Sequence, residues 1–427
     1  MPPALHHSSF RYYWGGLISA VIGYQGFLFL EFALMHQLEG SAWALGVLGV
    51  ATGVPAIVLG VAGGVAADRV DKRWLIGLTQ SGIMLGLAGL GLLTLTRTVQ
   101  VWHVLTLSMV IASLSSFDSP ARSAYFPRLV PREALISAVA LNSLVWQSTR
   151  VVGPAVAGVV VALVSSEPMT GIAVAFLASA ILVAIMPVMM VLVRVPGPGL
   201  AERNPLRDLA DAVRYAAEDR VVGFLLVLSY LQALLGWSYV VLMPVFAADV
   251  LGVGIDRQGG LLASAGAGAS IVTVALAMGG AGLARRRGWM VIGGAASTGV
   301  ALAGFALTAR WVGSYPLALG LIFVVGFTQT LFNTGAMGAL QLIIPDAYRG
   351  RVLGLYAIVW GIMPLSGTQA AALARLTGVP VAVALGGALI TVLALAALAS
   401  PTIRGLRQGE PPAPGPIPAP NTPEPKR

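Results

Sequence analysis

The sequence contains no cysteine. It therefore has no disulfide scaffold, no thiolate metal site and no thiol nucleophile. Histidine is also scarce: only His6, His7, His36 and His103 are present, and none pairs with another at metal-ligand spacing. No P-loop, HExxH motif or convincing Ser/His/Asp set is found. We therefore expect no enzyme, no cofactor and no bound metal. We expect no ATP-driven pump either, unless a partner subunit supplies the nucleotide site.

Charged residues are the second scarcity. They make up 10% of the 427 residues, whereas hydrophobic residues make up 57%; a soluble domain carries about 25% charged residues. Apolar runs are long, such as Thr170 to Val193 and Val221 to Ala248. A helix that crosses a bilayer needs about 20 such residues, and backbone in hydrocarbon must be helical or in a closed barrel. The composition predicts an all-α membrane protein.

Twelve spans are predicted from the apolar runs. They cover residues 12–37, 41–67, 74–95, 100–126, 137–164, 169–193, 221–248, 258–284, 289–309, 315–342, 352–376 and 380–402. No short apolar core with a small-residue cleavage site opens the chain, so we expect the first helix to be retained. The longest connector divides the chain into an N-terminal six-helix bundle (1–193), a linker (194–220), a C-terminal six-helix bundle (221–403) and a tail (404–427).

The linker and the tail have distinct compositions. In the linker, Asn204 can cap a helix, and Pro205 suits its first position. Leu206, Leu209 and Val213 then share one face, which predicts a short amphipathic helix on the cytoplasmic surface. The tail is rich in proline, and we expect it to be disordered.

Basic residues are distributed unevenly between the two sides of the predicted spans. Connectors carry most Lys and Arg on the cytoplasmic side of a membrane. One side holds Arg11, Arg69, Lys72, Arg73, Arg128, Arg132, Arg194, Arg203, Arg207, Arg214, Arg220, Arg285, Arg286, Arg287, Arg349, Arg351, Arg404, Arg407, Lys426 and Arg427. The other side holds only Arg97, Arg257, Arg310 and Arg375. This bias predicts a multi-pass protein of the cell membrane with both termini in the cytoplasm. It also accounts for the net charge of +9 without nucleic acid.

Two segments recur at nearly the same offset. GGVAADRVDKRWLI from Gly63 matches MGGAGLARRRGWMVI from Met278, and their tryptophans, Trp74 and Trp289, are 215 positions apart. A second match joins PRLVPREALISAVAL to PDAYRGRVLGLYAIV, 218 positions later. The offset is about half the chain, so it indicates duplicated six-helix halves. In transporters with such halves the binding site lies between them, near the middle of the membrane.

The same segments carry a family resemblance. GVAADRVDKR, from Gly64 to Arg73, resembles the signature between the second and third helices of the major facilitator superfamily, although Asp71 replaces a usual glycine. GPAVAG in the fifth span is similar to the GPxxGG signature of exporters, with Gly153, Pro154 and Gly158 matching and Ala157 replacing a glycine.

Other stretches resemble the bacterial drug and siderophore exporter branch. They are FDSPARSAYFPRLVP, ALNS, RVVGP, DLADAVRYAAEDR and YRGRV. Together the resemblances cover most of the chain from Phe10 to about Pro401. They imply two six-helix bundles, secondary transport of a small molecule in the lipid bilayer, and a monomer as the functional unit.

Four charged residues stand out well inside the predicted spans: Glu31, Asp118, Arg122 and Arg150. Each costs roughly 2.5–3.5 kcal/mol at the centre of a helix, so such residues commonly have a function. Glu31 is interpreted as a proton carrier in the first helix, because a dry cavity disfavours the anion. The alternative is a hydrated carboxylate near the outer interface, since Glu39 is only eight residues away.

Asp118 and Arg122 are four residues apart in the favourable order for a helical ion pair. The family resemblance implies that Asp118 meets Lys72 or Arg73, and that Asp68 meets the start of the eleventh helix. The motif residues Gly64, Asp68, Arg69, Lys72 and Arg73, with Asp118 and Arg122, would then form a cytoplasmic latch between the halves. The alternative is a static surface pair, worth under about 1 kcal/mol.

Arg150 lies near the middle of the fifth span, one turn before Gly153 and Pro154. Its side chain would not easily reach water from there. We therefore expect a counter-ion, with Glu31 and Asp118 as candidates, and proton coupling through Glu31 and Arg150. A purely structural ion pair is the alternative.

Uncharged candidates for the substrate cavity are Tyr24, Phe27, Tyr230, Gln232, Gln329 and Asn333. The alternative for each polar member is a hydrogen bond between helices. The predicted function is proton-coupled efflux, by antiport and alternating access, of a small amphipathic drug, siderophore or metabolite. Uptake or facilitated diffusion by the same fold is one alternative. A non-transporting scaffold or a membrane-embedded enzyme is another.

Overall fold

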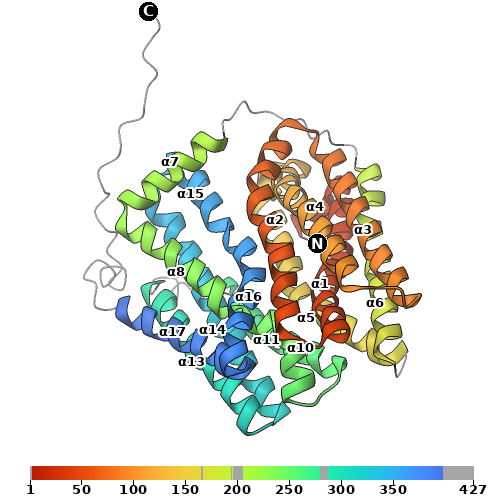
Figure 1. Ribbon diagram of the computed structural model, residues 1–427. Coiled ribbons are helices and arrows are strands. Elements are labelled where there is room, and N and C mark those ends of the chain that lie inside the picture. Colours follow the sequence, from red (N-terminus) through yellow and green to blue (C-terminus); the bar gives the residue numbers. More distant parts are fainter. Residues whose placement is uncertain (1, 165–166, 194, 196–204, 279–286, 398–427) are drawn as a thin grey trace, which may run out of the picture.

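A computed structural model describes residues 2–164, 167–193, 195, 205–278 and 287–397 of the chain. In these ranges it is helical and contains no strand. Twelve segments are long and apolar enough to cross a membrane, which confirms the predicted number of spans. Figure 1 shows that the helices form two groups, with a gap between them at one end of the molecule.

The N-terminal half contains six long helices. They are α1 (Ser8–Glu39), α2 (Ala42–Arg69), α3 (Lys72–Leu95), α4 (Val101–Tyr125), α5 (Leu135–Val164) and α6 (Pro168–Leu192). Short 3₁₀ turns, η1 (Pro3–His6), η2 (Phe126–Leu129) and η3 (Arg132–Ala134), precede α1 and connect α4 to α5. Within this half α6 packs against α1 and α3, and α4 packs against α2 and α3.

The C-terminal half follows the linker helix α7 (Pro205–Glu218). Its elements are α8 (Arg220–Gly236), α9 (Ser238–Val241), α10 (Met243–Val245), the π-helical turn η4 (Phe246–Val250), α11 (Ile255–Ala277), α13 (Arg287–Trp311), α14 (Tyr315–Ile343), α15 (Asp346–Ala357), α16 (Val359–Thr377) and α17 (Val379–Ala396). The predicted tail and the basic residues Arg285 and Arg286 lie outside the described residues.

Two predicted spans are interrupted helices. The stretch 221–248, expected as one helix, is broken after Gly236 and continues through α9, α10 and η4. Pro244 lies in this stretch and has no amide hydrogen to donate to the preceding turn. The eleventh span is likewise divided into α15 and α16 at Ile358. Both interruptions border the central cavity described below.

The linker helix α7 is attached to the C-terminal half. The ring of Tyr215 stacks on that of Tyr348 in α15, with centroids 4.9 Å apart. Asp211 and Arg351 form an ion pair of 3.2 Å between the same two helices. We call the side of the molecule that carries α7 the linker face, and the opposite side the far face; the linker face is at the top of Figure 1.

Buried apolar side chains show how the halves meet. Near the linker face each half has its own core, one around Phe10 and Tyr13, the other around Leu225 and Phe332. Near the far face a single core contains residues of both halves, including Leu45 and Phe246. The halves are therefore joined at the far face and separate at the linker face.

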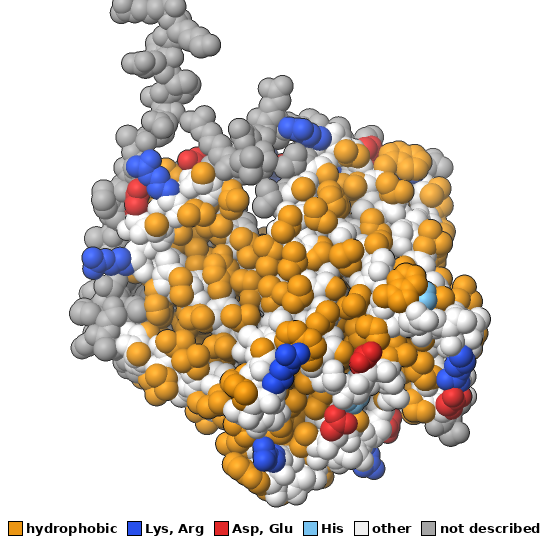
Figure 2. Space-filling view, in the orientation of Figure 1, with side chains coloured by type: hydrophobic (Ala, Val, Ile, Leu, Met, Phe, Trp, Pro, Cys, Tyr) orange, Lys and Arg blue, Asp and Glu red, His pale blue; other side chains and the backbone are white. Residues whose placement is uncertain are grey.

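The outer flank of the molecule is apolar. Large side chains such as Leu78, Leu163 and Ile181 are exposed there. Figure 2 shows hydrophobic side chains across this flank and most charged side chains toward its upper and lower ends. An apolar surface of this extent is typical of contact with lipid.

Candidate functional site

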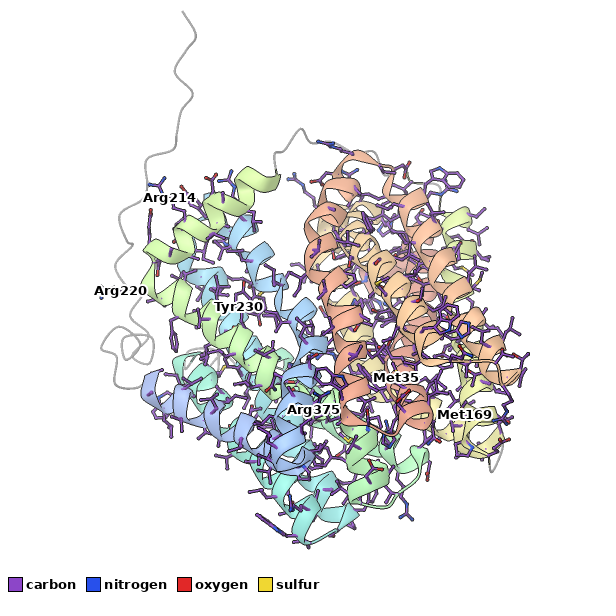
Figure 3. The ribbon with its side chains drawn as sticks, in the orientation of Figure 1. Met35, Met169, Arg214, Arg220, Tyr230 and Arg375 are labelled. Carbon is purple, nitrogen blue, oxygen red and sulfur yellow. The ribbon has the colours of Figure 1, made fainter. Side chains whose placement is uncertain are left out.

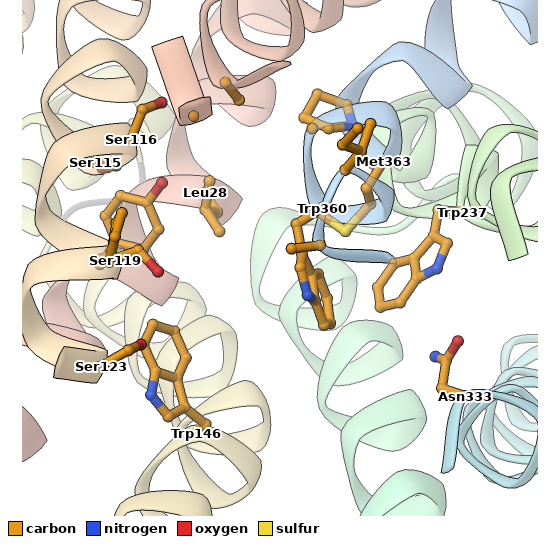
Figure 4. Close-up of a pocket in the computed structure, with 18 of the residues that line it drawn as sticks. Leu28, Ser115, Ser116, Ser119, Ser123, Trp146, Trp237, Asn333, Trp360 and Met363 are labelled. Carbon is orange, nitrogen blue, oxygen red and sulfur yellow. The ribbon is translucent and has the colours of Figure 1, made fainter. Parts of the chain in front are cut away.

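A cavity of about 2300 Å³ lies between the two halves. Its lining runs from Asp68 in α2 and Asp211 in α7, on the linker face, to Glu31 in α1. Figure 4 shows Ser119 and Trp146 on one wall and Trp237, Trp360 and Asn333 on the other. The cavity thus draws both polar and aromatic side chains from both halves, as a site for an amphipathic molecule requires.

Helix α2 closes the cavity toward the far face by packing on α16. Glycines on α2 allow the close approach: a Cβ added at Gly46 would lie 3.1 Å from the Cβ of Ala371, and one added at Gly53 would lie 2.9 Å from the carbonyl oxygen of Gly361. The hydroxyl of Thr368 also donates a hydrogen bond of 2.7 Å to the Gly46 carbonyl oxygen. This seam joins the two halves.

A second seam joins α5 to α11. A Cβ added at Gly158 would lie 3.4 Å from the Cα of Gly259. Farther along the two helices toward the linker face, the amide of Gln147 donates a hydrogen bond of 2.8 Å to the Thr273 hydroxyl. The two seams join the halves toward the far face. On the linker face the lining residues of one half are separated from those of the other by the cavity. The conformation is therefore open toward the linker face.

The GPAVAG motif lies in this second seam. A Cβ added at Gly153 would overlap Gln25 of α1, and Gly158 faces α11. The motif glycines therefore let α5 pack between a helix of its own half and a helix of the other half. Pro154, the remaining motif residue, lines the cavity.

Glu31 lines the cavity from α1 and is only 1% exposed. It forms no ion pair with any described residue, and its Oε2 atom has no hydrogen-bond partner among them. The Ser108 hydroxyl on α4 is its polar neighbour. Glu39, nearer the end of the same helix, is exposed. Glu31 is therefore a buried acid with no cation to balance its charge, and it is not in the hydrated setting of the alternative interpretation.

Asp118 and Arg122 form the ion pair that their spacing predicts, with Nε and Oδ2 2.7 Å apart. Asp118 also accepts a hydrogen bond of 3.1 Å from Thr79. The guanidinium of Arg122 lies 5.4 Å from the centre of the Trp146 ring. The aspartate is 1% exposed, so this pair is buried beside the cavity.

The basic residues expected to meet Asp118 lie elsewhere in this conformation. Arg73 donates hydrogen bonds of 2.7 and 2.9 Å to the carbonyl oxygens of Met190 and Val191, at the end of α6. Lys72 interacts electrostatically with Asp68 and Asp71. Asp118 instead contacts Arg122 of its own helix α4 and the polar side chains of Thr79 and Gln80 on the neighbouring helix α3.

The other motif residues lie at the mouth of the cavity. Gly64, Asp68 and Arg69 line it from α2. Asp68 forms no ion pair with a described residue, and a Cβ added at Gly64 would meet no atom within 4 Å. Arg351, near the start of α15, lines the facing wall. The predicted contact of Asp68 with the eleventh span is therefore open here, because the halves are apart on this face.

The environment of Arg150 differs from the prediction. Its guanidinium lies 5.8 Å from the ring centre of Trp237 and 5.1 Å from that of Trp360, both in the C-terminal half. It forms no ion pair with a described residue, so neither Glu31 nor Asp118 is its counter-ion. Asp118 is already paired with Arg122, and the Arg150 side chain extends across the cavity toward α8 and α16.

Four of the six uncharged candidates line the cavity: Tyr24, Phe27, Gln329 and Asn333. Tyr230 and Gln232 are not among the lining residues of the described chain. Tyr230 instead donates a hydrogen bond of 2.8 Å to the Leu355 carbonyl oxygen, and Gln232 is 1% exposed. The prediction that these two residues line the cavity is therefore wrong for this conformation, in which both side chains pack between helices.

Three tryptophans that line the cavity are missing from the predicted site: Trp146, Trp237 and Trp360. Each lies within a predicted span, some distance from its ends. Tryptophan in membrane proteins is enriched at the two interfaces. Its placement deep in three spans is the sequence signal that could have identified these residues.

Two helical bundles around a polar cavity that is open at one end define a secondary transporter of the membrane. A family model for transmembrane secretion effectors, within the major facilitator superfamily, matches residues 3–413. The chain belongs to this family. Its members are multi-pass transporters of small molecules that typically act as monomers, and transporters are not enzymes.

Curated relatives include a staphyloferrin A transporter and an enterobactin exporter. The staphyloferrin A transporter of Staphylococcus aureus is 28% identical over 211 residues, which are 49% of this chain and 52% of the relative. This chain thus spans about half the length of that relative. The enterobactin exporter EntS of Escherichia coli is 26% identical over 322 residues, which are 75% of this chain and 74% of the relative.

Solved structures share the fold. A bacterial homologue of the human lysosomal transporter Spinster, in an inward-facing and unoccupied conformation, gives a TM-score of 0.69 at 15% identity, covering 95% of this chain and 99% of the other. A mutant of the peptide transporter POT gives 0.73 at 13% identity, covering 94% and 96%. The expected major facilitator fold of two six-helix bundles is confirmed.

Proposed function

We propose that this protein is a proton-coupled exporter of a small amphipathic organic compound and works by alternating access as a monomer in the cell membrane. The observation that carries the proposal is Glu31, a buried acid that lines a cavity shared by both halves and has no balancing cation among the described residues. A passive carrier has no need of such a group. An acid in this position can bind and release a proton as the cavity changes its access.

The basic residues give the proposal its orientation. Arg214 and Arg220 lie on the linker face (Figure 3), and Arg351 is there too because it pairs with Asp211 of α7. All three belong to the side with the larger number of basic residues. By the positive-inside rule this face is cytoplasmic. The cavity is then open to the cytoplasm, the side from which an exported compound enters.

The proposed cycle couples two opposite movements. Glu31 takes up a proton when the cavity is open to the outside and holds it in the dry cavity, because burial disfavours the anion. In the inward-open state the cavity that Glu31 lines is open to water, which can accept that proton and carry it to the cytoplasm. Substrate and proton compete for one region of the cavity, so each leaves when the other binds.

The latch residues fit the other half of the cycle. When the cavity is open to the outside, the linker face must close, and Asp68 would then meet the start of α15. The hydrogen bond from Thr79 to Asp118 would hold α3 and α4 together during this movement, with Arg122 balancing the charge of Asp118.

Two observations support export over uptake. The GPAVAG motif lies in the seam between α5 and α11, although Ala157 departs from the exporter pattern. The relative that aligns over three quarters of the chain is an exporter of enterobactin. A siderophore or a similar metabolite is therefore a candidate substrate, beside drugs. Uptake or facilitated diffusion remains the alternative function.

A non-transporting scaffold is a further alternative. A scaffold has no use for buried charges beside a cavity, and Glu31 and Arg150 both lie there. A membrane-embedded enzyme would need reactive groups in this cavity. The family and the fold are instead those of transporters.

The test begins with a screen of drug susceptibility and metabolite accumulation in cells that lack or overproduce the protein. A compound found in this way is then followed in inverted membrane vesicles with an acidic lumen. Proton-coupled export predicts uphill accumulation in the vesicles that a protonophore abolishes. Accumulation that only reaches equilibrium, with or without the protonophore, would establish facilitated diffusion instead.

A further inference from the structure

Most charged groups that line the cavity have partners within the described chain. Asp118 pairs with Arg122 at 2.7 Å, and Asp211 pairs with Arg351 at 3.2 Å. Arg214 pairs with Glu218 at 2.9 Å. Asp68 and Arg69 remain at the mouth of the cavity, on the face open to water. The deep part of the cavity is left with one acid, Glu31, and one base, Arg150.

Arg150 is held by aromatic rings rather than by an acid. Trp237 and Trp360 lie 5.8 and 5.1 Å from its guanidinium carbon, and their own centroids are 6.3 Å apart in an edge arrangement. Rings at this distance attract the cation through their faces. They do not accept the hydrogen bonds that the N–H groups of the guanidinium can donate in its plane. Arg150 donates no hydrogen bond to another described residue, so its donors are available to a ligand.

We propose that Arg150, Trp237 and Trp360 form a subsite for the carboxylate of an aromatic organic anion. This inference rests on the proposed function, because it names the class of substrate that the exporter would carry. A guanidinium matches a carboxylate with two parallel hydrogen bonds, and Trp faces bind flat apolar groups. The ligand's negative charge would balance Arg150, a base deep in the cavity that forms no ion pair with another described residue.

The neighbouring polar groups suit the remainder of such a ligand. Asn333 lines the same wall, and Gln329 lies close to Tyr239 and the Gly236 carbonyl oxygen. Across the cavity Ser119 and Trp146 face this wall (Figure 4). These groups can donate hydrogen bonds to hydroxyl or carbonyl oxygens of an aromatic compound without adding a further charge.

Arg150 also connects the ligand to both halves. The arginine belongs to α5 of the N-terminal half, whereas both tryptophans belong to the C-terminal half. A carboxylate at this point contacts residues that move relative to one another during alternating access. The subsite can therefore differ between the inward-open and outward-open states, which a transported substrate requires.

The test measures binding to the purified full-length protein by calorimetry. Three probes share one ring system and differ in charge: 2-naphthoate, 2-naphthamide and 2-naphthylmethylammonium. We expect the wild type to bind 2-naphthoate tightest. The variant R150Q should lose about ten-fold or more in affinity for 2-naphthoate, as expected when a charged hydrogen-bond partner is removed, and little for 2-naphthamide. R150K should retain part of the preference, because it keeps the charge but not the planar donors.

A matched control is a second arginine that lies over a tryptophan ring but does not line the cavity. Arg375 lies 3.9 Å from the ring centre of Trp43, and this pair also joins the two halves (Figure 3). Neither residue lines the cavity. The variant R375Q should therefore retain the wild-type preference for 2-naphthoate.

The inference is overturned if the wild type binds 2-naphthoate no better than the amide or the ammonium, or does not bind it. It is also overturned if R150Q keeps the preference of the wild type. The wild-type comparison decides the question even if R150Q fails to fold. Because binding needs no gradient, a preference that depends on Arg150 in a protein without uphill transport would refute the proposed function and retain the subsite. Uphill export by the wild type, together with R150Q binding that is unchanged from the wild type, would retain the proposed function and refute the subsite.

Discussion

The hydroxyl of Thr368 on α16 donates a hydrogen bond of 2.7 Å to the carbonyl oxygen of Gly46 on α2. The two residues belong to different halves of the protein. Around them, glycines of α2 bring the backbones of α2 and α16 into direct contact, so these two helices leave no opening between them here. Alternating access requires this contact to separate once in every cycle.

A disulfide across this seam should stop transport. In the double variant G46C/A371C the new side chains start from Cβ positions 3.1 Å apart, close to the separation of about 3.8 Å found in disulfides. Because the native chain has no cysteine, no other disulfide can form. Oxidation should abolish transport in vesicles, and reduction should restore it. Unchanged transport in the fully oxidised double variant, with the two single variants as controls, would contradict a seam that opens.

The buried pair of Asp118 and Arg122 should contribute to stability. The variant D118N leaves the charge of Arg122 without its partner, and breaking a buried pair in this way costs roughly 3–5 kcal/mol. We expect a lower melting temperature in detergent and impaired transport. The double variant D118N/R122Q should regain part of the lost stability, because no unpaired charge remains. Equal melting temperatures for D118N and the wild type would show that the pair is not buried as described.

Asp68 is the contrast to Asp118. It forms no ion pair with a described residue in this conformation, which is open toward the linker face, so D68N should leave the melting temperature nearly unchanged. Transport should still fall, because the latch on the linker face cannot form. Full transport activity of D68N would argue against the latch.

Much of the fold could be predicted from the sequence. The number of spans follows from the length of the apolar runs, and the first predicted span, 12–37, lies within α1 (Ser8–Glu39). The interruption of the seventh span after Gly236 could not be predicted in this way, because apolar composition does not distinguish one continuous helix from several short ones.

The site was predictable only where its residues are close in sequence. Asp118 and Arg122 share one helix, so their spacing alone predicts the contact. The partners of Arg150 come from α8 and α16, and no local spacing relates residues so far apart. Directly after the break at Gly236, Trp237 lines the cavity, whereas the family resemblance implies a cavity-lining seventh helix without specifying which of its residues face the cavity.

Labelling of introduced cysteines tests the orientation. Glu218 lies in α7 on the linker face, and Asp256 lies at the start of α11 on the far face. A membrane-impermeant maleimide should label E218C in inverted vesicles but not in intact cells, because the positive-inside rule predicts a cytoplasmic linker face. It should label D256C in intact cells. The opposite pattern would reverse the membrane orientation and with it the direction of the open cavity.

Export of a monoanion in exchange for a proton should respond to the membrane potential. One proton moving inward and one monoanion moving outward together transfer two charges. Each charge is worth roughly 2.3 kcal/mol per 100 mV. A potassium diffusion potential, inside-positive in inverted vesicles, should therefore increase accumulation of an anionic substrate. Accumulation that is independent of the potential would rule out this stoichiometry and charge.

The role of Glu31 as the coupling group is the central claim. The variant E31Q keeps the size and hydrogen-bonding shape of the protonated acid but cannot release a proton. It should still bind substrate and yet fail to concentrate it. The matched control is E39Q, because Glu39 is an exposed acid of the same helix that does not line the cavity. E39Q should behave as the wild type.

The most direct measurement is the release of protons from acidified inverted vesicles when substrate is added. The account predicts release with the wild type and with E39Q, and no release above the empty-vesicle background with E31Q. If E31Q vesicles concentrate the substrate and release protons as the wild type does, Glu31 is not the coupling site, and Asp118 becomes the acid to test.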